Sequence, residues 1–207
     1  MKPKEILVFG ASGQIGRHLI RKLTKNNYKV VAVTRNIHQK GYILKTQANP
    51  GYLEMVELTY FNIEKIKSLV EECSVCINLI GILFEKRKNF FKNIHTDFPD
   101  LLSKLSAKKN IEKFIHLSSL GIEKSLDSNY AISKLDGENK IKNNFDRAVV
   151  LKPSIVYSVD DKFTTHFMTL LNRLPIIPIY YEGKTKFTPI HVTDLAQIIF
   201  DVVQGKT

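Results

Sequence analysis

Short apolar runs alternate along the chain with segments in which apolar residues recur every three or four positions. The runs predict six strands, at 6–9, 29–33, 53–58, 75–80, 114–117 and 148–151. The periodic segments predict helices at 14–26, 62–72, 89–109, 130–143, 163–174 and 193–203. We expect the third helix to be interrupted or bent near Pro99, and we expect Thr193 to cap the last helix. Continuous β-branched runs such as 29–33 are typical of parallel strands covered on both faces.

The alternation of strands and helices predicts an α/β fold. We expect a Rossmann-type doubly wound parallel sheet with helices on both faces. No internal repeat or low-complexity linker divides the chain, so residues 1–207 are expected to form a single domain. In such sheets, ligands bind at the carboxyl ends of the strands. The residues that follow each predicted strand are therefore the first candidates for a site.

A glycine-rich turn, Gly10-Ala-Ser-Gly-Gln-Ile-Gly16, joins the first strand to its helix. Gly10 suits a tight turn, Gly13 lets the backbone approach a pyrophosphate, and Gly16 lets the helix pack closely on the strand. Free amides at the helix N-terminus would face the phosphates. The turn predicts a dinucleotide site, with an ordinary glycine-rich connection as the alternative. Its predicted contacts are Gly10, Ser12, Gly13, Gln14, Ile15 and Gly16.

The end of the second strand bears on which dinucleotide is bound. NAD-preferring folds usually place an acidic residue there to hold the ribose 2′-hydroxyl. No Asp or Glu lies between Val30 and Gln39, and Arg35 could instead pair with a 2′-phosphate. This favours NADP(H) over NAD(H) as cofactor. The alternative is that Arg35 is a surface arginine.

A candidate catalytic pair follows the fifth strand. Tyr130 and Lys134 are four residues apart, which places them on one helical face, and Ser119 ends the preceding strand. A nearby ammonium is expected to lower the phenol pKa, so that Tyr130 could exchange a proton with a substrate hydroxyl or carbonyl. The spacing alone is weak, because Tyr180 and Lys184 repeat it. Only the serine-ended strand before Tyr130 distinguishes the two pairs.

The net charge of +11 is spread over scattered lysines without interleaved aromatic residues. This pattern favours a solvated surface over a nucleic-acid site, with an anionic membrane or acidic partner as alternatives. No apolar run has the length of a spanning helix and no leader is evident, so we expect a cytoplasmic protein. The apolar stretch 163–181 could contact a protein partner or a membrane surface, or pack in the core.

Cysteine and histidine spacing does not indicate a metal site. Cys73 and Cys76 form a single pair with no second pair to complete a zinc site, so buried reduced thiols are expected. The six histidines show no metal-ligand spacing. We expect no bound metal.

The order of these motifs resembles the short-chain dehydrogenase/reductase superfamily, in its extended or atypical branch, over essentially the whole chain. Within that branch the chain is most similar to the nucleotide-binding accessory subunit of respiratory complex I and its bacterial relatives. The similarity lies in the glycine turn and in the stretches 77–81, 89–91, 112–118, 130–138, 152–157, 161–163 and 187–194.

The resemblance implies a scaffold or assembly protein that holds NADPH as a structural cofactor, in contact with complex I at the inner face of the respiratory membrane. The alternatives are an active NADP-dependent reductase, epimerase or dehydratase with Tyr130 as acid/base, and an NADPH sensor without catalysis. The implied catalytic residues are Tyr130, Lys134 and Ser119. The further cofactor contacts that it implies are Glu57, Leu58, Ile80, Gly81, Ser118, Tyr130, Lys134, Pro153 and Ile155.

Several positions depart from the family pattern. Glu57 stands where Asp is usual, His95 where Asn is frequent, Lys152 where Arg is usual, and Ser158 where Gly often follows the aromatic residue. Relatives also continue beyond the position of Thr207, so we expect the C-terminal substrate lobe to be missing. Without that lobe, water would be poorly excluded from the site, which argues against efficient catalysis by this chain alone.

Overall fold

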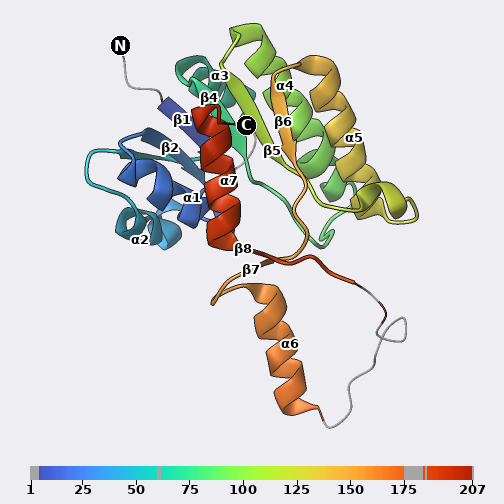
Figure 1. Ribbon diagram of the computed structural model, residues 1–207. Helices are drawn as coiled ribbons and strands as arrows, with labels where there is room; N and C mark the ends of the chain where they lie inside the picture. Colours follow the sequence, from blue (N-terminus) through green and yellow to red (C-terminus); the bar gives the residue numbers. More distant parts are fainter. Residues whose placement is uncertain (1–4, 60–61, 175–183, 185, 207) are drawn as a thin grey trace.

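Residues 5–59, 62–174, 184 and 186–206 are described in a computed structural model of the protein. Its main sheet has six parallel strands in the order β3-β2-β1-β4-β5-β6 (Figure 1). This is the strand order of the doubly wound dinucleotide-binding fold, so the predicted fold class is confirmed. All six predicted strands are present: β1 (Glu5–Phe9), β2 (Lys29–Thr34), β3 (Leu53–Glu57), β4 (Val75–Asn78), β5 (Lys113–Leu117) and β6 (Ala148–Leu151).

Helices cover both faces of the sheet (Figure 1). One layer contains α1 (Gln14–Lys25), α2 (Ile37–Gln47) and α7 (Val192–Gln204), and the other contains α3 (Ile63–Glu72), α4 (Phe98–Lys109) and α5 (Asn129–Asn144). Alternate residues of β1 serve the two layers. Ile6 and Val8 join the core beneath α1 and α7, whereas Leu7 and Phe9 join the core beneath α3 and α4. Residues 6–9 of β1 are thus buried, as their continuous apolar sequence indicated.

Helix α4 begins differently from the prediction. Residues 90–109 are helical, close to the predicted 89–109, but a π-helical segment, η1 (Lys92–Asp97), precedes α4 and interrupts the regular helix. Pro99 lies in the first turn of α4, where its missing N–H disrupts no regular helical hydrogen bond. The expected interruption near Pro99 is present as the π-helical segment that ends at Asp97. The irregular turn lies before the proline. Such wide turns are frequent at functional sites.

A second, two-stranded parallel sheet lies beyond β6. It pairs β7 (Val156–Tyr157) with β8 (Ile190–His191), and neither strand was predicted. The cap of α7 is His191 and not Thr193. The cap therefore lies two residues earlier than expected, and the Nδ1 atom of His191 accepts the backbone N–H of Thr193.

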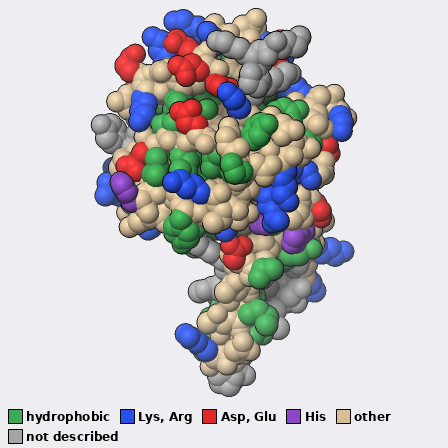
Figure 2. Space-filling view, turned by 90° about the vertical axis from the view of Figure 1, so that its left-hand side faces the viewer, with side chains coloured by type: hydrophobic (Ala, Val, Ile, Leu, Met, Phe, Trp, Pro, Cys, Tyr) green, Lys and Arg blue, Asp and Glu red, His purple; other side chains and the backbone are tan. Residues whose placement is uncertain are grey.

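Helix α6 (Lys162–Arg173) confirms the predicted helix at 163–174 and extends away from the main layers (Figure 1). Hydrophobic side chains are visible on this projection in the space-filling view (Figure 2), and Phe167, Met168 and Leu171 are among the exposed ones. The rest of the apolar stretch, at 175–181, and with it Tyr180, lies outside the described residues. Within the described part of the chain, no helix has the length and apolar character needed to cross a membrane.

Candidate functional site

The glycine turn has the geometry expected of a phosphate cradle. Gly10 has φ +78°, and a Cβ on Gly16 would lie 2.4 Å from the Ala11 carbonyl oxygen, so both positions require glycine. Gly13 is the N-cap of α1 and offers no side-chain acceptor to the first amides of the helix. These amides, with the positive end of the helix dipole, fit an anionic group such as a pyrophosphate.

The carboxyl ends of β2 and β3 lie beside this turn. Ser12 and Thr34 bond through their hydroxyls at 3.0 Å, and Arg35 is exposed next to them. The Glu57 carboxylate accepts the Ile37 backbone N–H at 2.8 Å and thereby holds the start of α2. The topology thus brings the residues predicted to contact the adenosine half of a dinucleotide to one edge of the sheet. Leu58, which is also among them, is buried.

The predicted catalytic residues meet at the ends of β5 and α5. The Ser119 Oγ and Tyr130 Oη atoms are 2.8 Å apart and hydrogen-bonded. Lys134 is only 5% exposed, its Nζ donates to the Leu117 carbonyl at 3.3 Å, and it lies 5.7 Å from the centre of the Tyr130 ring. The three side chains therefore form one constellation, as the sequence predicted.

These residues line a cavity of about 170 Å³. Ser118 contributes a hydroxyl that is buried and has no hydrogen-bond partner within the described residues. An orphaned buried hydroxyl of this kind fits a polar ligand atom. The other lining residues are Leu79, Gly81, Ile82, Leu83, Leu117, Ser119, Tyr130, Lys134, Pro153, Ser154 and Val156. Ile80 lies beside Gly81, whereas Ile155 uses its carbonyl to pair with Ile190.

The pKa shift of Tyr130 has the opposite direction to the one expected from the sequence. Burial raises the pKa of Tyr130, and the Ser119 hydrogen bond opposes that shift. Burial also lowers the pKa of Lys134 to about 8, which the Glu138 carboxylate opposes. The expectation that a nearby ammonium lowers the phenol pKa is wrong here, because desolvation is the dominant effect. Tyr130 is thus a neutral phenol at pH 7, suited to donating a proton or a hydrogen bond.

His95 is a site residue whose role was not predicted. Its ring stacks on Phe91 at 5.4 Å and meets the Tyr130 ring edge-on at 5.3 Å. Its Nε2 accepts the Ile82 N–H at 3.1 Å, so the proton belongs on Nδ1, which donates to the Ser133 hydroxyl at 3.0 Å. Burial, with Lys134 nearby, lowers the pKa of His95 to about 3, and the ring is neutral. In the sequence, His95 was only a departure from the family pattern.

The segment 158–160, which follows β7, forms side-chain contacts with the first turn of α1. Gln14 donates to the Ser158 hydroxyl at 2.9 Å, and Arg17 pairs with Asp160 at 2.6 Å. This link places β7 over the glycine turn. Sequence reasoning identified Ser158 only as a departure and did not predict the contact between residues so far apart in the chain.

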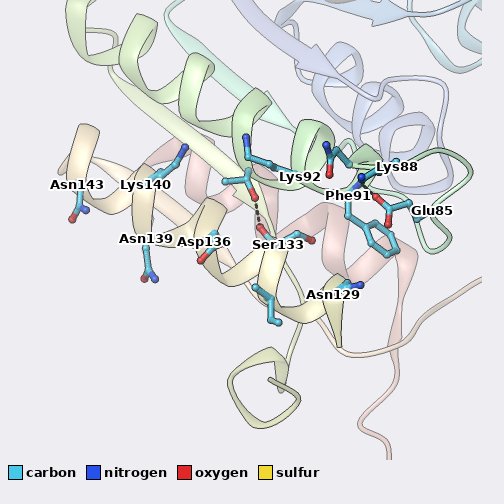
Figure 3. A pocket seen from close by; sticks show the side chains of 13 residues that line it. Glu85, Lys88, Phe91, Lys92, Asn129, Ser133, Asp136, Asn139, Lys140 and Asn143 are labelled. Atoms are coloured by element: carbon cyan, nitrogen blue, oxygen red, sulfur yellow. Dashed lines mark hydrogen bonds between the residues drawn. The ribbon is translucent and has the colours of Figure 1, made fainter. Parts of the chain in front are cut away.

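A larger cavity of about 640 Å³ lies between α5 and the segment 85–96, which leads through η1 into α4 (Figure 3). Ser133, which also bonds His95, is part of its wall. Its other lining residues are mostly polar: Glu85, Lys88, Asn89, Phe91, Lys92, Thr96, Asn129, Ile132, Asp136, Asn139, Lys140 and Asn143.

The cysteines agree with the sequence expectation of buried, reduced thiols. Burial raises the pKa of Cys73 to about 12 and raises that of Cys76 as well. Among the described residues, no group of three or more His, Cys, Asp or Glu side chains could hold a metal ion.

Comparison with known proteins agrees with this geometry. The model of the NAD dependent epimerase/dehydratase family matches residues 6–206. The chain belongs to this family. A solved relative in fold is a UDP-glucuronic acid 4-epimerase from Bacillus cereus, in complex with UDP-glucuronic acid and NAD, with a TM-score of 0.79 and 22% identity. The match covers 98% of this chain and 74% of that one.

Sequence relatives within the epimerase/dehydratase family include subunits of mitochondrial complex I. The 40 kDa subunit of NADH-ubiquinone oxidoreductase from Neurospora crassa is 26% identical, over 93% of this chain and 50% of that protein. NADH dehydrogenase [ubiquinone] 1 alpha subcomplex subunit 9 of Dictyostelium discoideum is 29% identical, over 95% and 54%. A ceramide reductase of Caulobacter vibrioides is 25% identical, over 92% and 58%. The resemblance to the complex I subunits is confirmed, and the chain spans about half their length.

Proposed function

We propose that this chain binds a nicotinamide dinucleotide across the carboxyl ends of the sheet, with NADP(H) favoured over NAD(H), as a structural cofactor. The observation that carries the proposal is the glycine turn, which opens onto uncapped amides of α1 in a sheet of dinucleotide-binding order. A bound nicotinamide dinucleotide can supply hydride transfer. The residues of this chain supply phosphate contacts at α1, a ribose contact at Lys134 and a polar wall at Ser118.

The preference for NADP(H) rests on Arg35. The guanidinium is exposed at the end of β2, and no acidic residue lies between positions 30 and 39 to hold a 2′-hydroxyl. The nearest acidic candidate, Glu57, is engaged with the Ile37 amide. A planar guanidinium suits a 2′-phosphate.

We further propose a scaffold or assembly role of the complex-I-accessory type, at the inner face of the respiratory membrane. The support is the similarity to complex I subunits over nearly the whole chain. The raised pKa of Tyr130 agrees with this role, because a phenol that holds its proton can bond a bound cofactor without acting as a base.

A second candidate function is an NADP-dependent reductase, epimerase or dehydratase. It is favoured by the 2.8 Å contact between Ser119 and Tyr130, with Lys134 one turn further along α5. In a reduction, the Tyr130 hydroxyl would donate its proton to the substrate oxygen, and Ser119 would orient that oxygen. Similarity to a ceramide reductase and to a sugar-nucleotide epimerase supports this alternative.

Nucleotide titration tests the first proposal. Binding of NADPH and NADH is followed by cofactor fluorescence in the wild type and in Arg35→Ala. Loss of charge-assisted contacts worth about 1.5–3 kcal/mol should weaken NADPH binding roughly 10- to 150-fold and leave NADH binding unchanged. Arg21→Ala, an exposed arginine on α1, is the matched control. Equal loss for both nucleotides would refute the role of Arg35, and no binding of either would refute the proposal.

Tyr130→Phe separates the two functions. Under the enzyme reading, turnover of a carbonyl substrate is lost while nucleotide binding is retained. Under the scaffold reading, neither protein turns over substrate, and both are recovered with complex I from solubilised membranes at low salt. Recovery of free protein alone would contradict the scaffold role.

A further inference from the structure

Four charged side chains of alternating sign lie behind Tyr130. Lys134 and Glu138 occupy successive turns of α5, Lys152 follows β6, and Glu123 belongs to η2 (Ile122–Lys124). Glu138 is 0% exposed and Lys134 is 5% exposed. The Lys152 Nζ lies 2.8 Å from the Glu138 Oε2 and also pairs with Glu123. The alternating charges therefore extend from the buried Lys134 to Glu123 at the surface.

Three titratable groups near Lys134 are uncharged. His95 on η1 and His116 on β5 are both neutral, because burial lowers their pKa values to about 3. Tyr130 retains its proton, and the hydrogen bond that Lys134 makes is to the Leu117 carbonyl. The charge that favours the ammonium is the carboxylate of Glu138, four residues along the same helical face.

The charge of Glu138 is only partly compensated by its own partner. Lys152 forms an ion pair with it, but the carboxylate oxygens make no well-aligned hydrogen bond within the described residues. Lys152 is shared with Glu123, whose negative charge offsets that of the ammonium. In a buried setting such a field is weakly screened and acts on the neighbouring turn of the helix.

We infer that Glu138 is a positioning residue, the buried counter-charge that keeps Lys134 an ammonium, and that Lys152 and Glu123 hold its carboxylate in place. The inference rests on the proposed function, because an ammonium at Lys134 is the form that can hold a nicotinamide ribose and donate to it. Burial alone would favour a neutral amine there.

Direct titration of Lys134 tests the inference without any nucleotide. Lysine side-chain NMR signals are followed from pH 6 to pH 11, and the Lys134→Arg variant assigns the signal. In Glu138→Gln, the midpoint of Lys134 should fall by about 1 pH unit, the lower end of the range for loss of a nearby opposite charge, because Lys152 already offsets part of the Glu138 charge. Glu138→Asp keeps the charge and should restore the midpoint. An unchanged midpoint in Glu138→Gln would overturn the inference.

Glu138→Gln leaves Lys152 with one partner fewer and could unfold the protein. The double variant Glu138→Gln/Lys152→Gln removes both charges together and gives a second measurement. The Lys134 midpoint should again fall, and a midpoint equal to that of the wild type overturns the inference.

Nucleotide affinity distinguishes a charge effect from a structural one. At pH 6, Lys134 is protonated in every variant, so Glu138→Gln should bind NADPH like the wild type. At pH 8 the variant should bind several-fold more weakly, because it has lost the ammonium. Equal weakening at both pH values would assign Glu138 a purely structural role and overturn the inference. Absence of NADPH binding by the wild type would refute the proposed function, while the NMR titration would still test Glu138.

Discussion

Gly137 of α5 packs directly against the backbone of His95 in η1, and its replacement by alanine offers a sharp test of the site architecture. A Cβ at this position would lie 1.9 Å from the His95 carbonyl oxygen and 3.1 Å from its carbonyl carbon. Ordinary contact begins near 3.4 Å, so the two backbones would have to separate by about 1.5 Å (3.4 − 1.9). Backbone atoms cannot rotate away as the end of a flexible side chain can.

The expected magnitude follows from two opposing effects. Overpacking of a well-packed interior costs about 1–3 kcal/mol, and a rigid backbone contact belongs at the upper end. Alanine in place of glycine within a helix stabilises by about 1 kcal/mol. We therefore expect Gly137→Ala to lower the free energy of unfolding by about 2 kcal/mol. In a chain of this size this corresponds to a decrease in Tm of roughly 4–8 °C.

Urea denaturation and thermal melting measure this loss. Asn139→Ala, at an exposed position two residues along the same helix, is the matched control and should leave stability within about 0.5 kcal/mol of the wild type. Separation of α5 from η1 should also disturb the Ser133 contacts to His95 and Thr96, and so weaken nucleotide binding. A Gly137→Ala protein as stable as the control would refute the reasoning, because the close approach would then not exist in solution.

Three further outcomes are expected. His95 and His116 have folded-state pKa values of about 3 against 6.5 when unfolded, so the unfolded chain binds more protons as pH falls. The stability that the two neutral rings contribute is complete above pH 6.5 and is lost towards pH 3 by about 1.4 kcal/mol per pH unit for each ring. Urea denaturation midpoints at pH 7 and pH 5 measure this loss. In His116→Gln, the free energy of unfolding should depend less steeply on pH. Gly16→Ala would place a Cβ 2.4 Å from the Ala11 carbonyl oxygen, so it should weaken dinucleotide binding, and unchanged affinity by titration would contradict the proposed cradle. Cys73 and Cys76 should react with a thiol reagent only after unfolding, because both are buried with raised pKa values, and rapid labelling of native protein would oppose that expectation.

The sheet was predictable because parallel strands buried on both faces read as uninterrupted apolar runs. The elements that escaped prediction lack such a signal. Helix α2 buries only Gly41 and Leu44, so it has no apolar stripe, and β7 and β8 have two residues each. The cap at His191 depends on where the preceding bridge ends, which the sequence pattern does not specify.

The candidate site likewise contains residues that could be predicted from the sequence and residues that could not. Residues at strand ends, such as Gly10, Arg35 and Ser119, could be assembled from topology alone, because all parallel strands end at one edge. The contact of His95 with Tyr130 could not, since it requires η1 to pack on α5 at the particular approach that Gly137 permits. The sign of the pKa shift at Tyr130 depends on burial, which spacing in the sequence does not reveal.

The packing of α7 against α1 has a consequence for synthesis on the ribosome. Leu19 and Ile20 share one core with Ile199 and Val203, which are synthesised much later. While α7 is still inside the ribosomal tunnel, the apolar face of α1 and the adjoining side of β1 have no cover. The core beneath α1 therefore cannot close until α7 has emerged, and until then the nascent chain presents a hydrophobic surface that suits a chaperone.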